Sequence, residues 1–405
     1  MIPLSDSTSQ HDFTTQRQET SIMKSAKYKF FTPTQLLFGE GCSADIGKWI
    51  KEFNGTKVLL VTDKGLVQAG LVDDIKQHII AEGLDIVVFD EVEENPTEQN
   101  VSDGRDIIIR DNIDIVVALG GGSPMDAAKA MAVLSSHPGN IAEYELGLKP
   151  LTQAGLAVIV IPTTAGTGSE ATMGSVITDQ KTHRKFDVVS PLMGPRLALV
   201  DPLVTQMLPA ALTAATGMDA LTHAVEGYTA TLASPLTDAL HLKAITMLGI
   251  DLPRAYHDGS DRQARSSVMM ASMIAGIGFP NSGLGAVHGL TLPLGGHFGI
   301  PHGIANAIML PHVMQFNLEA CPNKFVNIAN ALGAHADEPE QAVSKIMALR
   351  RELQIPLLSA YNINRKDLDI LARDALGRNS NCVTNPRKIS PDEARTVYLR
   401  ALEEK

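Results

Sequence analysis

The residues with the strongest chemical signature are one aspartate and three histidines in the second half of the chain. Asp219 and His223 lie four residues apart in "GMDALTHAVEGY", a spacing that places both side chains on one face of a helix. His288 and His302 follow in "AVHGLTLPLGGHFGIPHG", 302 − 288 = 14 residues apart. A single histidine of this kind is more often a hydrogen-bonded buried side chain. A carboxylate with three imidazoles instead predicts a divalent metal site, and these ligand types suit Fe²⁺, Zn²⁺, Co²⁺ or Ni²⁺.

Two more histidines lie close to this set in the sequence. His297 is five residues before His302, and it is a candidate for relaying a proton in the pocket; the alternative is a surface or packing role. We expect His312, in "LPHV", to be structural.

Two glycine-containing turns form a second candidate site. Gly120–Asp126 reads "GGGSPMD", and Pro162–Glu170 reads "PTTAGTGSE". Glycine lets the backbone approach a ligand closely, and the free N–H groups at a helix start attract phosphate. Each segment alone is also compatible with a capped turn or a polar loop. Because both follow predicted parallel strands, where ligands bind beyond the carboxyl ends, we expect a nucleotide there.

Asp63 ends the first predicted strand, in "VTDKG". A carboxylate at this position accepts hydrogen bonds from an adenosine ribose and repels the 2′-phosphate of NADP, which favours NAD. The alternative is an aspartate that caps a turn or a helix.

These residues need a scaffold of alternating strands and helices. Short apolar runs, "KVLLVTD", "DIVVFDEV", "IDIVVALGGG" and "LAVIVIPTT", alternate with helical patterns and predict a parallel sheet covered on both faces. After about residue 207, long segments rich in Ala, Leu and Met predict helices only. We therefore expect an arm without order over residues 1–27, an α/β nucleotide-binding domain over 28–206 and a helical metal-binding domain over 207–405.

The composition of the chain limits the kinds of partner that it can bind. The chain has 405 residues, a net charge of −11 and only 4% aromatic residues, which argues against binding nucleic acid. Its three cysteines are far apart, and no apolar run reaches the length of about 20 residues that spans a membrane. We expect a cytoplasmic protein with no membrane partner.

Taken together, these motifs resemble the iron-containing (group III) alcohol dehydrogenase family, in particular the branch that contains lactaldehyde reductase and 1,3-propanediol dehydrogenase. The similarity extends from about Thr32 to the C-terminus, with "GGGSPMD", "PTTAGTGSE", "DALTHAVEGY" and "VHG…PHGIANAIMLPHV" in the same order. It implies a dehydroquinate synthase-like fold, with an α/β dinucleotide-binding domain and an all-α C-terminal domain. It also implies a homodimer or higher homo-oligomer, joined partly through strands such as "YKFFTPTQLLFG".

The resemblance assigns roles to individual residues. The metal ligands are Asp219, His223, His288 and His302, with Fe²⁺ favoured and Zn²⁺ as the alternative. The residues that bind NAD(H) are Asp63, Asn95, Gly121, Gly122, Ser123, Asp126, Thr163, Thr164, Thr167, Thr172, Val176 and Lys185.

One position departs from the family pattern. Many members have H-x-x-x-H where this chain reads "HGLTL", from His288 to Leu292, and the second histidine of the pair is often assigned to proton relay. Leu292 cannot carry a proton, so His297 is the candidate catalytic residue; otherwise water and the cofactor ribose carry the proton, or activity on the usual substrates is reduced.

The expected function is hydride transfer between NAD(H) and a small alcohol or aldehyde, with the metal acting as a Lewis acid. The alternatives are a hydroxyacid–oxoacid transhydrogenase, a zinc polyol dehydrogenase of the glycerol type and a nucleotide-binding scaffold without activity.

Overall fold

A computed structural model describes residues 27–182, 184–377 and 381–404. The chain from Thr32 to Lys405 forms one compact unit, which holds all the helices and strands discussed below. Apart from Lys27, the predicted N-terminal arm over residues 1–27 lies outside the described residues.

A six-stranded parallel sheet forms the first half of this unit, with the strand order β1-β8-β5-β4-β2-β3. Its strands are β1 (Gln35–Phe38), β2 (Lys57–Val61), β3 (Asp85–Phe89), β4 (Ile115–Gly120), β5 (Ala157–Pro162) and β8 (Leu197–Val200). The four apolar runs predicted as strands are β2, β3, β4 and β5. The short strands β8 and β1 extend the sheet at one edge.

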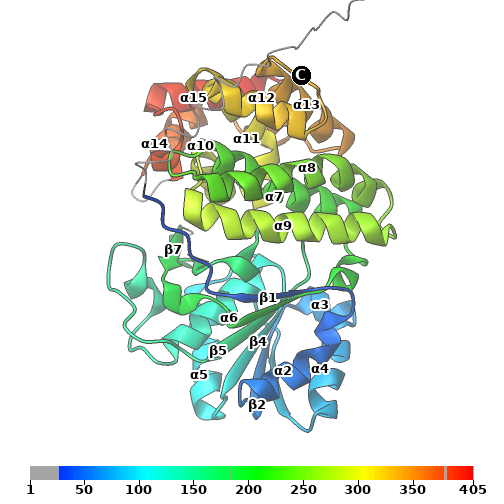
Figure 1. Ribbon diagram of the computed structural model, residues 1–405. Coiled ribbons are helices and arrows are strands. Elements are labelled where there is room, and N and C mark those ends of the chain that lie inside the picture. The colour runs from blue at the N-terminus through cyan, green and yellow to red at the C-terminus, as the bar shows by residue number, and fades with distance from the viewer. Residues whose placement is uncertain (1–26, 183, 378–380, 405) are drawn as a thin grey trace, which may run out of the picture. The chain divides into compact units, whose positions relative to one another are not determined.

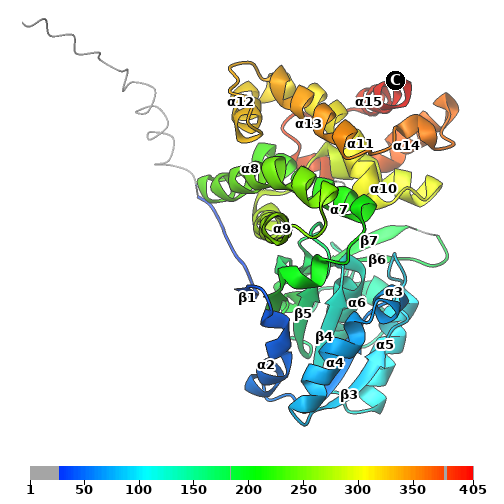
Figure 2. The ribbon, with the colours of Figure 1, turned by 90° about the vertical axis from the view of Figure 1, so that its right-hand side faces the viewer.

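Helices cover both faces of the sheet (Figures 1 and 2). Residues that point alternately to the two sides of a strand, such as Leu59 and Leu60 of β2, fall into two separate apolar cores. Both cores are buried, so the strands read as continuous apolar runs rather than as alternating ones. The covering helices are α2 (Ile46–Glu52) and α4 (Leu71–Ala81) on one face, and α5 (Glu98–Arg110) and α6 (Gly122–Leu134) on the other.

A separate antiparallel hairpin, β6 (Gly174–Thr178) and β7 (Lys185–Val189), follows the fifth strand of the chain. The Thr178 N–H donates to the Pro96 carbonyl oxygen at 2.8 Å, which ties the hairpin to the segment before α5. The guanidinium of Arg184 donates two hydrogen bonds to the Glu145 carboxylate, at 2.9 and 2.8 Å. Both contacts lie at the turn end of the hairpin, beside the paired residues Thr178 and Lys185.

In the described part of the chain after residue 200, every regular element is a helix, as predicted. The longer helices are α7 (Ala210–Thr229), α8 (Pro235–His257), α9 (Arg262–Ser282), α10 (Ala286–Phe298), α11 (His302–Asn317), α12 (Pro322–Ala331), α13 (Glu340–Glu352), α14 (Leu368–Ala375) and α15 (Pro391–Glu403). The combination of a parallel α/β sheet and a helical second half confirms the predicted fold class. Within the described residues, no helix has the length and apolar character needed to cross a bilayer.

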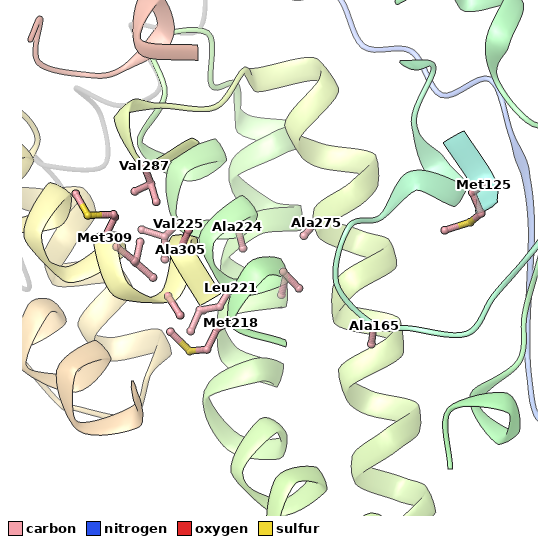
Figure 3. Packing of buried hydrophobic residues seen from close by; sticks show 14 of the residues in the cluster. Met125, Ala165, Met218, Leu221, Ala224, Val225, Ala275, Val287, Ala305 and Met309 are labelled. Atoms are coloured by element: carbon pink, nitrogen blue, oxygen red, sulfur yellow. The ribbon is translucent and has the colours of Figure 1, made fainter. Parts of the chain in front are cut away.

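Helices α7, α8 and α9 pack side by side (Figure 1). Figure 3 shows Met218, Leu221 and Val225 of α7 gathered against Ala305 and Met309 of α11. The residues of α7 from Gly217 to Thr229 are all buried. The polar side chains that this stretch carries therefore lie within an apolar core, where each must find a partner.

Lys129 of α6 connects the sheet half to the loop and hairpin that follow β5. Its side chain is fully buried, and its ammonium donates to Ser169 Oγ at 2.7 Å and to the Gly174 carbonyl oxygen at 2.5 Å. The same ammonium lies 3.0 Å from Asp126 Oδ1. The Lys129 ammonium thus contacts α6, the loop after β5 and the first residue of β6.

We expect Lys129→Met to destabilise the protein by about 3–5 kcal/mol, since removing one partner leaves a buried carboxylate without its counter-charge. Urea unfolding measures the change. The control is Lys149→Met, because the Lys149 side chain is 46% exposed and pairs with Glu143 at 3.4 Å. Equal stabilities of the two variants would contradict this account of Lys129.

Candidate functional site

The glycine turn lies between β4 and α6, as the sequence predicts. Gly121 is the N-cap of α6, and Gly122 is its first residue. A Cβ atom on Gly122 would lie 2.8 Å from Thr167 Cγ2, so only glycine permits this close approach of the two loops. The N-terminus of α6 therefore opens beside the hydroxyl-rich loop that follows β5.

Asp126 holds the two loops and the hairpin in register. Its Oδ1 accepts a hydrogen bond from Ser169 Oγ at 2.5 Å, and its Oδ2 accepts one from the Val176 N–H at 2.8 Å. Its own carbonyl oxygen accepts from Ser175 Oγ at 2.8 Å. Asp126 also lines the cleft described next, so it is placed both to organise the site and to contact a ligand.

A cleft of about 440 Å³ runs from the glycine turn to the metal-ligand candidates. Twelve of the residues predicted to bind cofactor or metal line it: Asn95, Gly122, Ser123, Asp126, Thr167, Thr172, Val176, Lys185, Asp219, His223, His288 and His302. Leu292 lines the cleft as well, with Phe279, Pro280 and Leu284. The structure thus brings the two candidate sites into one cavity.

Four of the predicted cofactor residues lie outside the lining of that cleft. They are Asp63, Gly121, Thr163 and Thr164. Asp63 follows β2 and caps α3 (Lys64–Gln68), where its Oδ1 accepts a hydrogen bond from the Leu66 N–H at 3.0 Å. Thr163 and Thr164 follow β5, and the Thr163 N–H donates to the Gly120 carbonyl oxygen at 3.0 Å. All four are at the carboxyl edge of the sheet, where parallel strands place nucleotide contacts.

Three of the four predicted metal ligands converge. Asp219 of α7, His288 of α10 and His302 of α11 each offer one donor atom, and these atoms lie within 4.8 Å of one another. The Asp219 Oδ1 atom is 3.7 Å from His302 Nε2 and 4.0 Å from His288 Nε2. Zinc–nitrogen and zinc–oxygen bonds are about 2.0–2.2 Å long, so a cation fits between donors separated by about twice that distance.

His223 lies directly beside this cluster. Its ring stacks on His288 with centroids 4.6 Å apart, and on Phe279 at the same distance on its other face. Its Nδ1 atom is buried and has no hydrogen-bond partner among the residues that the structure describes. A buried imidazole nitrogen without a partner is costly unless a ligand uses it, which fits a fourth donor at this site.

Burial sets the ionisation of the donors. Burial lowers the pKa of His223 to about 4, and it lowers the pKa of His302 as well. These two imidazoles are therefore neutral at pH 7, the form that binds metal. Burial raises the pKa of Asp219, but the neighbouring imidazoles and the Asn306 amide outweigh it and hold that pKa below its ordinary value. The aspartate remains a carboxylate.

Asn306 is a site residue that the sequence analysis missed. Its Oδ1 accepts a hydrogen bond from Thr291 Oγ1 at 2.7 Å, which turns its Nδ2 toward the donor cluster. That Nδ2 donates to Asp219 Oδ1 at 2.7 Å and lies 3.2 and 3.1 Å from the Nε2 atoms of His288 and His302. The available signal was its spacing, since Asn306 follows His302 by four residues in α11.

Glu226 and Lys129 were missed as well. Glu226 follows His223 by three residues in α7, and its carboxylate accepts a hydrogen bond from His288 Nδ1 at 2.5 Å. Lys129 follows Asp126 by three residues in α6. All three missed residues share a helix face with a residue of the predicted sites, so helical spacing places them near a site but does not show that they are buried against it.

The structure does not bring His297 into the cleft. It follows His288 by nine residues, and at about 100° per residue this places it on the opposite face of α10. Its side chain is 39% exposed, and its Nε2 lies 2.7 Å from Asp374 Oδ2. Leu292, one turn after His288, takes the place beside the ligands instead. His312 is buried away from the cleft, with its Nε2 2.9 Å from Glu404 Oε2.

We expect Asn306→Leu to destabilise the metal-free protein by about 2–3 kcal/mol, because it leaves the buried Asp219 carboxylate without its amide donor. Urea unfolding in the presence of a chelator measures the loss. Asn327→Leu is the matched control, since Asn327 Nδ2 donates to Tyr228 Oη at 2.9 Å outside the site. A smaller loss for Asn306→Leu than for Asn327→Leu would count against the assignment.

Both halves of the chain are similar to proteins of one known family. Residues 33–202 match the iron-containing alcohol dehydrogenase family, and residues 213–402 match the C-terminal region of the Fe-containing alcohol dehydrogenase family. The chain is 39% identical over 383 residues to the 1,3-propanediol dehydrogenase of Citrobacter freundii, covering 92% of this chain and 98% of that one. It is 38% identical over 374 residues to the lactaldehyde reductase of Escherichia coli, with 90% and 97% covered.

Solved structures agree. A crystal structure of 1,3-propanediol oxidoreductase superimposes with a TM-score of 0.90 at 39% identity, covering 93% of this chain and all of that one. The sulfoacetaldehyde reductase of Bifidobacterium kashiwanohense, solved in complex with NAD⁺, superimposes with a TM-score of 0.87 at 29% identity, covering 94% and 100%. Both halves of the chain, its relatives and its architecture lead to one assignment: the protein belongs to the iron-containing alcohol dehydrogenase family.

Proposed function

We propose that this alcohol dehydrogenase is metal-dependent and NAD(H)-linked, and that it interconverts a small alcohol and its aldehyde. The observation that carries the proposal is one cleft that joins the N-terminus of α6 to the donor atoms of Asp219, His288 and His302. A nucleotide site and a cation site in one cavity suit hydride transfer to or from an oxygen-bearing carbon.

The nucleotide end of the cleft suits a pyrophosphate. The backbone N–H groups at the start of α6 offer donors, and the helix dipole favours the negative charge, whereas the Ser123 hydroxyl donates to the Glu94 carbonyl oxygen. Asp63 caps α3 through Oδ1 alone, which leaves its second oxygen for a ribose hydroxyl. A carboxylate there disfavours the extra phosphate of NADP, which supports a preference for NAD.

At the other end, Asp219, His223, His288 and His302 would hold a divalent cation, with Fe²⁺ favoured over Zn²⁺ by the family. When bound, the cation supplies Lewis-acid polarisation of the substrate oxygen, and the nicotinamide supplies the hydride chemistry. The side chains of Phe279, Leu284 and Leu292 line the cleft and exclude water from it. The apolar lining favours short alcohols and aldehydes, and the sulfoacetaldehyde, lactaldehyde and propanediol enzymes among the relatives act on substrates of that size.

Proton transfer has no histidine beside the ligands at position 292. His297 lies outside the cleft, so the alternatives are proton transfer by water and the hydroxyls of the cofactor ribose, or reduced activity on the usual substrates. Membership in an enzyme family of dehydrogenases argues against a nucleotide-binding scaffold. The homo-oligomer and the cytoplasmic location stay predictions.

We expect chelation of the purified enzyme to lower kcat with short aldehydes and NADH by about 100-fold or more, because electrostatic stabilisation of the substrate oxygen is lost. Adding Fe²⁺ or Zn²⁺ should restore the rate. Asp219→Asn should lower both metal content and rate, whereas Asp369→Asn, at an exposed pair with Arg395, should change neither. NADH oxidation and elemental analysis are the measurements, and a metal-free preparation with full activity would refute the proposal.

We expect Leu292→His to add an ionisation to the pH dependence of kcat below the range of a free imidazole, because the burial that lowers the pKa of His223 and His302 acts on a ring in the same cleft. The wild-type protein should lack this inflection. Leu292→Asn is the matched control because its side chain is polar but does not titrate. If the His and Asn variants gave the same pH profile, position 292 would have no access to the transferred proton.

A further inference from the structure

Glu226 is a buried carboxylate of α7 that contacts the first turn of α10. It lies on the same helix as Asp219 and His223, and all three side chains are buried. Its Oε1 accepts a hydrogen bond from the Val287 N–H at 2.6 Å. Its Oε2 lies 2.5 Å from His288 Nδ1 and 3.4 Å from the His288 backbone nitrogen.

The helix that carries His288 begins without a capping side chain of its own. Its N-cap is Gly285, and a Cβ atom there would lie 2.8 Å from Glu226 Oε1 and 2.9 Å from Asn385 Oδ1. Asn385 Oδ1 accepts a hydrogen bond from the Ala286 N–H at 3.1 Å. Two side chains from distant segments therefore satisfy the first N–H groups of α10, and the glycine leaves space for both.

The contact between Glu226 and His288 fixes which ring nitrogen is protonated. An ionised carboxylate only accepts hydrogen bonds, so the proton of the imidazole is on Nδ1 and the lone pair is on Nε2. That Nε2 is the atom 4.0 Å from Asp219 Oδ1. The Asn306 amide nitrogen, which can only donate, lies 3.2 Å from the same Nε2, in agreement with a lone pair on that atom.

Charge favours the same arrangement. Asp219 and Glu226 are the two carboxylates of the buried cluster. Two negative charges balance a divalent cation, whereas Asp219 alone would leave a net positive charge in an apolar core.

We propose that Glu226 is a positioning residue: it locks the tautomer and the ring orientation of His288 and thereby sets the affinity of the site for its divalent cation. The inference rests on the proposed metal dependence. It goes further by assigning the strength of metal binding to a residue that does not itself contact the metal. Mutation of a residue that hydrogen-bonds to a metal-binding histidine typically weakens metal binding by about 10- to 100-fold.

The test measures the dissociation constant for Co²⁺ and Zn²⁺ by competition with a chelator, using full-length protein stripped of metal. Glu226→Gln keeps an oxygen for the Val287 N–H but loses the charge, and Glu226→Asp keeps the charge but withdraws it by one methylene. We expect both to bind metal about 10- to 100-fold more weakly than the wild type. The absorption spectrum of bound Co²⁺ should also change, since one ligand is no longer held in place.

Two controls separate positioning from stability. Asn385→Ala removes the neighbouring cap of α10 without contact to His288. Asp201→Asn alters another buried carboxylate, which accepts hydrogen bonds from the Gly41 and Leu203 N–H groups far from the cleft. Both should lower the urea midpoint while leaving metal affinity within about threefold of the wild type, because neither touches a ligand.

The outcomes are distinct. If the wild type binds no divalent cation in this assay, the proposed metal dependence fails. If the wild type binds and either folded Glu226 variant binds within about threefold of it, the positioning role is wrong although the proposed function survives. Weakening of the same size in Asn385→Ala would show that Glu226 acts only by capping the helix.

Discussion

The site depends on burying several polar donors of one cluster without leaving their other atoms unsatisfied. Asp219, His223 and Glu226 lie on one helix that is buried along most of its length, and each needs partners within an apolar core. The amide of Asn306 serves Asp219, and the carboxylate of Glu226 serves His288. The Asn306 amide nitrogen also lies 3.2 and 3.1 Å from the Nε2 atoms of His288 and His302, so these donor atoms face a common centre, which supports the proposed cation site.

The same principle operates at the other end of the cleft, beside the glycine turn, with a different residue. Lys129 is a fully buried cation whose partners are a carboxylate, a hydroxyl and a carbonyl oxygen from three successive segments. By binding them together it fixes the distance between the glycine turn and the β6–β7 hairpin. Both ends of the cleft are thus shaped by buried ionised groups that hold neighbouring residues in place.

The sequence predicted those parts of the structure whose signals lie within a short stretch of chain. The apolar runs of β2 to β5 and the spacing of Asp219 and His223 are local signals. The hairpin was not predicted, because Ser175, Lys185 and Asp187 interrupt its apolar residues where they face the cleft. Strand β8, "LALV", is too short to stand out from a loop.

Other residues of the candidate site were not predicted, because only the packing of the helices places them beside the predicted ligands. Glu226 and Asn306 are ordinary residues for a helix surface, and only the approach of α7, α10 and α11 shows that they are buried against ligands. His297 was chosen for its residue type, whereas the rotation of α10 directs it away from the cleft. The family resemblance alone assigns Asn95, Thr172, Val176 and Lys185 to the nucleotide, and this assignment stays a prediction.

One contact between glycines has a consequence for redesign of the enzyme. Gly168 has a φ of +62°, and a Cβ atom on it would lie 2.5 Å from the Cα of Gly276 in α9. The loop after β5 and a helix of the second half thus touch backbone to backbone. Directed evolution of substrate range should therefore vary Leu284 and Leu292 and spare both glycines. A side chain at either glycine would force the loop and α9 to move apart, and this would change the shape of the cleft for every substrate.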